Sequence, residues 1–215
     1  MPRAEASTAI QFDDPAQQRH AATLGMWVFL ATEVLFFGAL FLGYTVYRFL
    51  YPADFRAASE HTLVLIGSIN TGILLTSSFT VVLAVRAAEM RQHPRVFQYL
   101  LLSAALGAVF LGLKAYEYHA EFREGLLPTS AFHIEGADAA HARIFFSFYF
   151  VMTGLHAIHV AIGVVLLSLF AIRALLTRKP ERFATAVDLL GLYWHFVDIV
   201  WVFLFPLIYL VGRHA

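Results

Sequence analysis

Five ionisable side chains lie inside long apolar stretches of this sequence, and they are its first candidates for chemistry. They are Glu33, His156, His159, His195 and Asp198. Such groups can relay protons, bind metals or haem, or fasten helices to one another by hydrogen bonds. An acidic group at membrane depth is energetically expensive and usually faces protein rather than lipid. The question is therefore which neighbouring groups these side chains meet.

Residues 193–201 place two of these groups on one helix. His195 and Asp198 are spaced i, i+3, and residues three or four apart are neighbours on a helix face. Trp194, Asp198 and Trp201 share one stripe, with His195 beside it. We interpret this stretch as the polar fastening of the last helix, with the two tryptophans filling the space around it.

Glu33 lies at a depth that two of the histidines share. It is about 13 residues into its apolar stretch, or roughly 20 Å at about 1.5 Å per residue. His159 and His195 lie at a similar depth from the same membrane face, so the three side chains could meet. A central carboxylate costs on the order of 2.5–3.5 kcal/mol, which the surrounding apolar residues offset. The simplest role for Glu33 is structural, as a protonated group hydrogen-bonded to a neighbouring helix.

The histidines do not predict a metal or haem site. His156 and His159 form a His-x-x-His pair, but no carboxylate or thiolate stands at ligand spacing to complete a zinc site. A haem between helices needs two opposed imidazoles. A transmembrane di-haem anchor usually repeats histidines at a fixed spacing on each of two helices, and the last two segments do not show that pattern. The chain has no cysteine, which excludes disulfides, iron–sulfur clusters, covalent haem attachment and thiolate copper sites. We expect hydrogen-bonded structural histidines and no cofactor in this chain.

The elements that must position these groups are long apolar segments. The 215 residues are 60% hydrophobic and 14% charged, whereas soluble domains are about 45–50% apolar and about 25% charged. Five segments reach the roughly 20 residues that span a bilayer. None shows the short alternating strands of a barrel. The sequence predicts an all-α, polytopic bundle of five transmembrane helices at about 21–49, 62–88, 96–119, 141–175 and 185–212, after a polar cytoplasmic tail over residues 1–20.

Basic residues in the connections predict the orientation. With the N-terminus in the cytoplasm, nine Lys and Arg side chains lie on that side and six on the other. Cytoplasmic loops carry the excess of positive charge, so the N-terminus is expected in the cytoplasm and the C-terminus in the periplasm. The formal net charge is zero, which gives no broad basic surface for nucleic acid.

Charged residues also gather at the end of the third segment. They are Lys114, Glu117, His119, Glu121, Arg123 and Glu124. Long charged side chains at a helix end can lie along apolar surface while their heads stay in water. We interpret this group as a solvated helix end.

Four stretches resemble subunit III of the haem-copper oxidases, of the cytochrome c oxidase type. Residues 25–37 are similar to that family's glutamate-bearing helix, and residues 116–118 to its glutamate–tyrosine helix end. Residues 148–160 resemble its Thr-Gly-x-His-x-x-His helix. Residues 193–201 resemble its Tyr-Trp-His-Phe-x-Asp-x-x-Trp signature. They occur in the family's order and cover most of the chain.

The resemblance implies a non-catalytic subunit of an aerobic, proton-translocating oxidase in a bacterial inner membrane. Such a subunit holds no redox centre, because haem and copper belong to partner subunits. It packs directly on subunit I, assembles with subunit II and the other oxidase subunits, and binds phospholipid. It supports proton uptake and protects the oxygen-reducing site from inactivation during turnover.

The resemblance also assigns residues. Glu33 matches the family's buried, carbodiimide-reactive glutamate, and His156, His159, His195 and Asp198 match its buried polar positions. Candidate lipid or interface residues are Trp27, Glu117, Trp194 and Trp201. The long form of the family has seven helices, and this chain resembles the five-helix form. Lipid sites that need the first two helices are therefore not carried over.

Alternatives remain within the family and outside it. A quinol oxidase subunit III often has aspartate where Glu33 stands, which favours cytochrome c as donor, and a nitric oxide reductase accessory subunit shares the layout. A small proton-coupled transporter is a different class, in which Glu33 and the histidines would relay protons. Transporters usually show internal repeats and interrupted helices, which are not evident here. A haem-binding membrane anchor is a third class.

Overall fold

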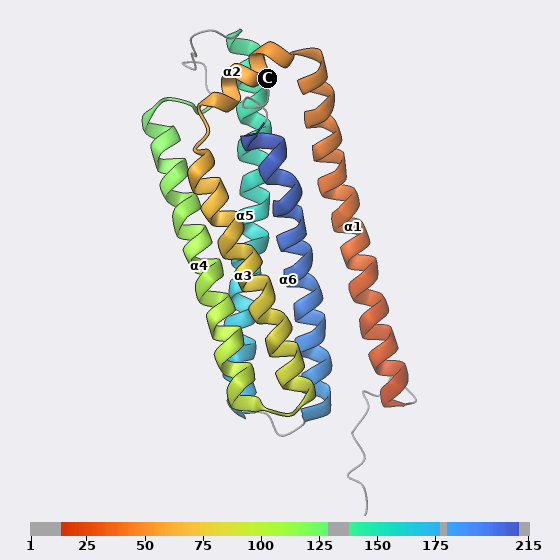
Figure 1. Cartoon of the computed structure of the whole chain (residues 1–215). Coiled ribbons are helices and arrows are strands. Elements are labelled where there is room, and N and C mark those ends of the chain that lie inside the picture. Colours follow the sequence, from red (N-terminus) through yellow and green to blue (C-terminus); the bar gives the residue numbers. More distant parts are fainter. Residues whose placement is uncertain (1–13, 129–137, 177–179, 211–215) are drawn as a thin grey trace, which may run out of the picture.

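The computed structural model describes residues 14–128, 138–176 and 180–210, and the described chain is helical (Figure 1). The helices are α1 (Pro15–Leu50), α2 (Pro52–Glu60), α3 (Val64–Glu89), α4 (His93–Arg123), α5 (Ala139–Leu176) and α6 (Pro180–Tyr209). All except α2 are long and apolar enough to cross a membrane. The predicted all-α fold with five spanning helices is confirmed.

The helix ends differ from the sequence-based bounds for local reasons. The Asp14 side chain accepts a hydrogen bond from the Gln17 amide at 2.6 Å, and Pro15 occupies the first helical position. Helix α1 therefore begins inside the segment expected to be a polar tail. Pro52 likewise starts α2, which lies between the first two spanning helices expected from the sequence. The rest of that tail, the basic pair Arg178 and Lys179, and the expected end of the last helix at residue 212 lie outside the described residues.

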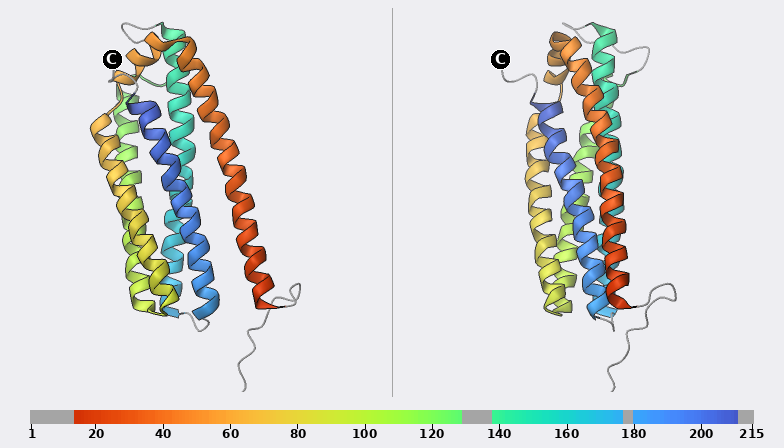
Figure 2. Two further views of the ribbon diagram at one scale, coloured as in Figure 1. Left: turned by 45° about the vertical axis from the view of Figure 1, so that its right-hand side comes forward. Right: turned by 90° about the vertical axis from the view of Figure 1, so that its right-hand side faces the viewer.

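Helices α3 to α6 form a ring in which each contacts two neighbours. The pairs are α3–α4, α4–α5, α5–α6 and α6–α3. Helix α1 lies outside this ring against α5 and α6, and α2 crosses the end of the bundle onto α5 (Figures 1 and 2). Towards its N-terminus α1 diverges from the ring, where Leu24 and Trp27 are exposed. Only 11% of the most apolar 18-residue stretch of α1 is buried, against 56% of the corresponding stretch of α6.

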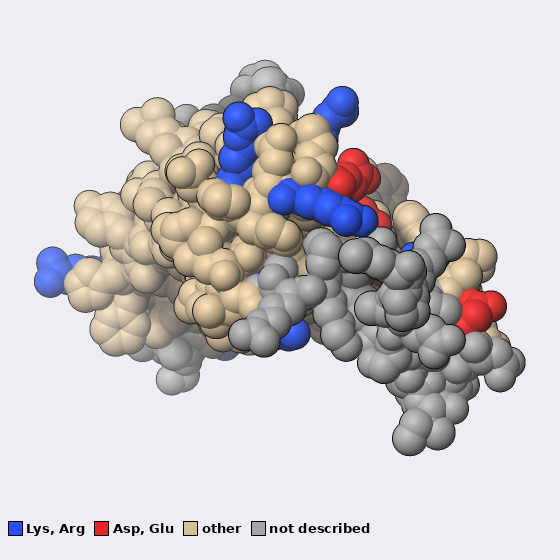
Figure 3. Space-filling model, turned by 90° about the horizontal axis from the view of Figure 1, so that it is seen from below, with Lys and Arg blue, Asp and Glu red and all other residues tan. Residues whose placement is uncertain are grey.

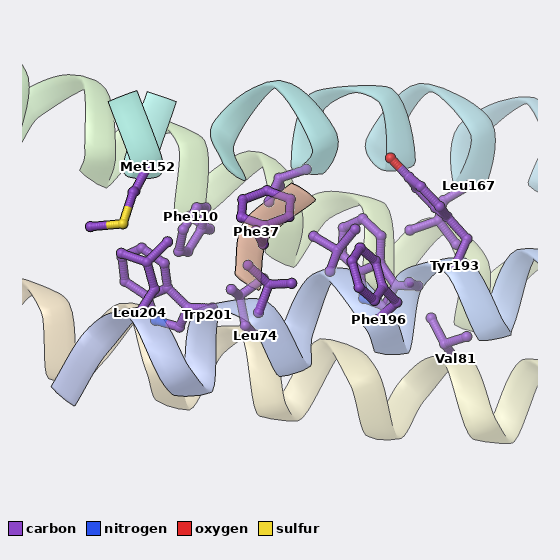
Figure 4. Packing of buried hydrophobic residues seen from close by; sticks show 14 of the residues in the cluster. Phe37, Leu74, Val81, Phe110, Met152, Leu167, Tyr193, Phe196, Trp201 and Leu204 are labelled. Carbon is purple, nitrogen blue, oxygen red and sulfur yellow. The ribbon is translucent and has the colours of Figure 1, made fainter. Parts of the chain in front are cut away.

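The core of the ring is built from large aromatic side chains beside glycines. Trp194 and Trp201 of α6 are buried, and the Trp201 ring meets Phe110 of α4 edge-on, with centroids 4.8 Å apart (Figure 4). A Cβ at Gly163 would come within 2.5 Å of the Trp194 ring, and one at Gly107 within 2.8 Å. The two glycines therefore let α4 and α5 approach the indole from both sides, as small residues do between membrane helices.

The end of the bundle that carries the start of α1 and the α3–α4 connection is rich in basic groups. Seen from below, Lys and Arg side chains stand out around this end with few acidic groups beside them (Figure 3). Met90, in the α3–α4 connection at this end, is exposed. The distribution is the one expected for a cytoplasmic face, and the orientation of the chain stays a prediction.

Candidate functional site

Glu33 and His159 meet at the seam between α1 and α5. The Glu33 Oε2 lies 3.2 Å from His159 Nε2, and the two side chains are 19% and 16% exposed. His159 Nδ1 lies 2.8 Å from the Leu155 carbonyl oxygen. A carbonyl only accepts, so Nδ1 carries a hydrogen and Nε2 is left to face Glu33. One proton therefore lies between Nε2 and the carboxyl group, either on glutamic acid beside neutral imidazole or on imidazolium beside carboxylate.

Aromatic residues from two further positions hold this pair. The Phe37 ring stands edge-on to the His159 imidazole, with centroids 5.4 Å apart. The Tyr193 hydroxyl donates to the His159 carbonyl oxygen at 2.9 Å. Side chains of α1, α5 and α6 thus converge on the Glu33–His159 pair. The Tyr44 hydroxyl makes a second polar contact of α1 by donating to the Leu207 carbonyl oxygen of α6 at 2.6 Å.

The expected meeting of three groups occurs for two of them. His195 is at a similar depth, but its Nδ1 is hydrogen-bonded to the Ser78 hydroxyl of α3 at 2.6 Å. The position of His195 along α6 predicts its height in the bundle but not the direction of its side chain. Helix α6 turns this imidazole towards α3, whereas Glu33 approaches from α1.

A polar seam joins α6 to α3. The indole of Trp194 donates to Ser77 Oγ at 3.1 Å, and the indole of Trp201 donates to Thr71 Oγ1 at 3.0 Å. The bond between Ser78 and His195 adds a third contact on the same face. These hydrogen bonds give a last helix rich in aromatics a defined register against α3, which agrees with the fastening interpretation of residues 193–201.

Asp198 belongs to this seam without completing a catalytic triad. It is 6% exposed and lies beside Ser78. Its Oδ1 has no hydrogen-bond partner among the described residues. Ser78 bonds to His195, but no bond joins Asp198 to that imidazole within the described chain. The serine, histidine and aspartate therefore lack the order of a hydrolase relay, in which the acid orients the histidine.

His156 and His159 face different neighbours although they are three residues apart. The His156 ring is buried and stacks on Trp201, with Phe110 edge-on to it. Neither of its ring nitrogens has a described partner. Across residues 14–128, 138–176 and 180–210, no three His, Cys, Asp or Glu side chains come together as a metal-binding group.

The predicted solvated end of α4 is wrong for three of its residues. Lys114, Glu117 and Glu121 are 3%, 0% and 2% exposed, and they point into the ring. The Lys114 ammonium donates to Glu117 Oε2 at 3.0 Å and to the hydroxyls of Tyr149 and Tyr209 at 2.8 and 2.7 Å. The spacing could have predicted this burial, because these residues continue the buried stripe of Gly107 and Phe110 at helical intervals.

Burial also corrects three of the four candidate lipid or interface residues. Trp27 is 57% exposed on α1, as a lipid or partner contact requires. Glu117, Trp194 and Trp201 lie inside the ring and reach no outer surface. A tryptophan in a membrane helix can sit in the interior when a polar partner takes its indole hydrogen, as Ser77 and Thr71 do here.

Comparisons with known proteins identify the family of this chain. The model of the family described as Cytochrome c oxidase subunit III matches residues 6–213. A cytochrome c oxidase subunit 3 from Thermostichus vulcanus is 33% identical over 210 residues, which cover 96% of this chain and 95% of the relative. One from Alkalihalophilus pseudofirmus is 34% identical over 197 residues, covering 88% and 86%. A probable quinol oxidase subunit 3 from Staphylococcus saprophyticus is 28% identical over 205 residues, covering 93% and 94%.

The fold is that of a multi-pass helical membrane protein whose ionisable groups are held within and between its helices. The chain belongs to the cytochrome c oxidase subunit III family. Its relatives are subunits of terminal oxidases, which are oxidoreductases with several subunits.

Proposed function

We propose that this chain is the non-redox subunit III of a proton-pumping terminal oxidase, which packs directly on subunit I and assembles with subunit II. Haem and copper then belong to the partner subunits. The observation that carries the proposal is the pair Glu33–His159, a proton-sharing contact on a helix that is only partly packed. A group that holds one proton near an open seam is suited to supporting proton uptake by a neighbouring subunit.

A partner subunit has a surface to bind on α1. Val34, Leu35 and Leu42 are 58%, 74% and 67% exposed on this helix. These side chains lie on the face of α1 that points away from the ring. In a membrane such a face can be covered by lipid or by another spanning helix, and the proposal assigns part of it to subunit I.

A hollow beside the same helix supports the proposed binding of phospholipid. A hollow of about 300 Å³ lies between α1 and α5, lined by Leu40, Tyr47, Ile144, Ser147, Phe148 and Val151. Its lining is apolar except for two hydroxyl groups. A lipid acyl chain matches this lining, and lipid held here would fill the seam at one end of α1.

Purification of the complex through a tag on this chain tests the proposal. We expect subunits I and II to copurify, with haem absorption that stays with subunit I when this chain is removed. Oxidase lacking the chain should lose activity faster during sustained turnover than the intact complex. A tagged chain that carries no oxidase subunits, or that keeps its own haem absorption, would overturn the assignment.

A quinol-oxidizing complex is the second candidate, because relatives named probable quinol oxidase subunit 3 are also similar over nearly the whole chain. The Glu33 residue favours cytochrome c as the donor. Oxygen consumption by the purified complex distinguishes the two. We expect turnover with reduced cytochrome c, and turnover with a quinol alone would assign the chain to the other enzyme.

A further inference from the structure

The buried end of α4 carries more negative than positive charge. Lys114, Glu117 and Glu121 follow one face of α4 inside the ring, and each is nearly inaccessible. Lys114 lies roughly 13 Å from the helix end at Arg123, at about 1.5 Å per residue. Glu121 lies in the last turn of the same helix, so the buried group runs from the interior of the bundle towards its end.

The hydrogen-bond donors of Lys114 are all used. An ammonium group has three, and they go to Glu117 Oε2, Tyr149 and Tyr209. Three carboxylate oxygens remain without a described partner, namely Oε1 of Glu117 and both oxygens of Glu121. The hydroxyl of Tyr118 is engaged with Thr153. The hydroxyls of Tyr149 and Tyr209 accept from Lys114 and keep one hydrogen each, which they can donate to a carboxylate without supplying positive charge.

No other described side chain supplies the missing positive charge. The charged neighbours of Glu121 are Lys114, Glu117 and Glu124, and Glu124 is exposed. On α5 the groups facing the cluster are Tyr149 and His156, and on α6 the group is Tyr209. Helix α3 has no ionisable side chain before Arg86, which lies near its other end.

Charge balance then requires one more cation. Two carboxylates and one ammonium leave a net charge of minus one, and a buried unpaired charge is very costly. Glu117 and Glu121 are also spaced i, i+4, where like charges repel. A proton removes both problems, because a carboxylic acid is neutral and gives one of the unpartnered oxygens a hydrogen to donate.

We propose that Glu117 and Glu121 form a buried proton-binding site that holds one proton, carried by Glu121, while Glu117 stays paired with Lys114. The surface exchanges this proton through Glu124, one helical turn beyond Glu121. The site lies wholly within this chain, so it does not depend on the proposed oxidase function or on any partner subunit.

Infrared spectroscopy of the full chain in detergent tests the charge balance by counting protonated carboxyl groups. We expect Glu121→Gln and Glu117→Gln each to lose the carbonyl absorption of one carboxylic acid, because one carboxylate then balances Lys114. Lys114→Met should gain one, because both carboxyls then need protons. Glu124→Gln and Arg143→Gln are the controls and should leave the absorption unchanged. Circular dichroism checks that each variant is folded.

The alternatives give different spectra. If Glu121→Gln and Glu117→Gln both leave the carbonyl absorption unchanged, the site holds an alkali cation or water instead of a proton, and the proposal is overturned. A gain in Arg143→Gln would show that Arg143 supplies the balancing charge and would overturn it too. If Lys114→Met does not fold, the two glutamine variants, which keep the shape of the side chain, decide the question.

Discussion

At the scale of single residues, the proton between Glu33 and His159 determines the charge of both groups. The bond from His159 Nδ1 to the Leu155 carbonyl fixes the ring, so Nε2 faces Glu33 in either protonation state. An amide at position 33 still offers a hydrogen-bonding group to Nε2. A hydrocarbon side chain does not, and it leaves the imidazole without its partner.

We therefore expect Glu33→Gln to assemble almost normally and Glu33→Leu to lose about 1–3 kcal/mol of stability. Resistance of the purified complex to detergent, followed with temperature, measures the difference. Leu169→Val is the control, since Leu169 is exposed on α5 and lies outside the α1 surface proposed to bind subunit I. Equal resistance of the two Glu33 variants would argue against a structural hydrogen bond.

Asp138, just outside the membrane-spanning part of α5, gives a pH-dependent prediction. Hydrogen bonds from the backbone N–H groups of Ala140 and His141 lower the pKa of its carboxyl group. A lowered pKa means that this helix cap is fully effective above the ordinary value of 3.8 and is lost as the pH falls through the lowered value. At that acidic end, the exchange rates of the Ala140 and His141 amides should rise relative to those of an unfolded peptide at the same pH.

Asp138→Asn should keep slow exchange without the pH dependence, because the amide oxygen still accepts these hydrogen bonds. Asp138→Ala should exchange fast throughout. If exchange in the native chain does not change with acid, the carboxylate is not the cap.

At the scale of the helices, close approach around one tryptophan holds the ring together. Gly163 on α5 and Gly107 on α4 leave room for Trp194 of α6, and Ser77 of α3 accepts its indole hydrogen. Four helices thus meet at one side chain. A methyl group added at either glycine would push its helix away from α6, because a packed interior does not deform to absorb it.

We expect Gly163→Ala to destabilise the chain by about 1–3 kcal/mol, since its Cβ would overlap the Trp194 ring. Thermal unfolding followed by tryptophan fluorescence measures this. Gly112→Ala on α4 is the matched control, because nothing lies within 4 Å of its added Cβ. A Gly163 variant as stable as the control would mean that Trp194 can move aside freely.

At the scale of the whole molecule, the ring and the partly detached α1 make two different surfaces. The ring fills its interior with its own side chains, whereas α1 leaves most of its apolar area outside. Its outer face is therefore where lipid or other subunits must cover apolar area. The basic loops predict the orientation of this assembly in the membrane.

Single cysteines can test that orientation because the chain has none of its own. We expect Glu124→Cys to react with a membrane-impermeant maleimide added to intact spheroplasts, and Met90→Cys to react only after the membrane is opened. Both positions are exposed and lie at opposite ends of the bundle. The reverse labelling pattern would place the N-terminus in the periplasm.

The five spanning helices could be predicted from the order of residues alone, since a long apolar segment in lipid satisfies its backbone hydrogen bonds by forming a helix. The sequence also identified the ionisable groups within them and the family signatures. Its boundaries were less accurate, because Asp14 and Pro52 start helices in segments that are polar in composition.

The tertiary structure alone decided which groups meet. Helical spacing gives the angle between His156 and His159, but only the packing places Trp201 at one angle and Glu33 at the other. The same reason explains Lys114, Glu117 and Glu121, whose charges suggest water until α5 and α6 cover them. A side chain's direction follows from its own helix, whereas its environment follows from helices that are distant in sequence.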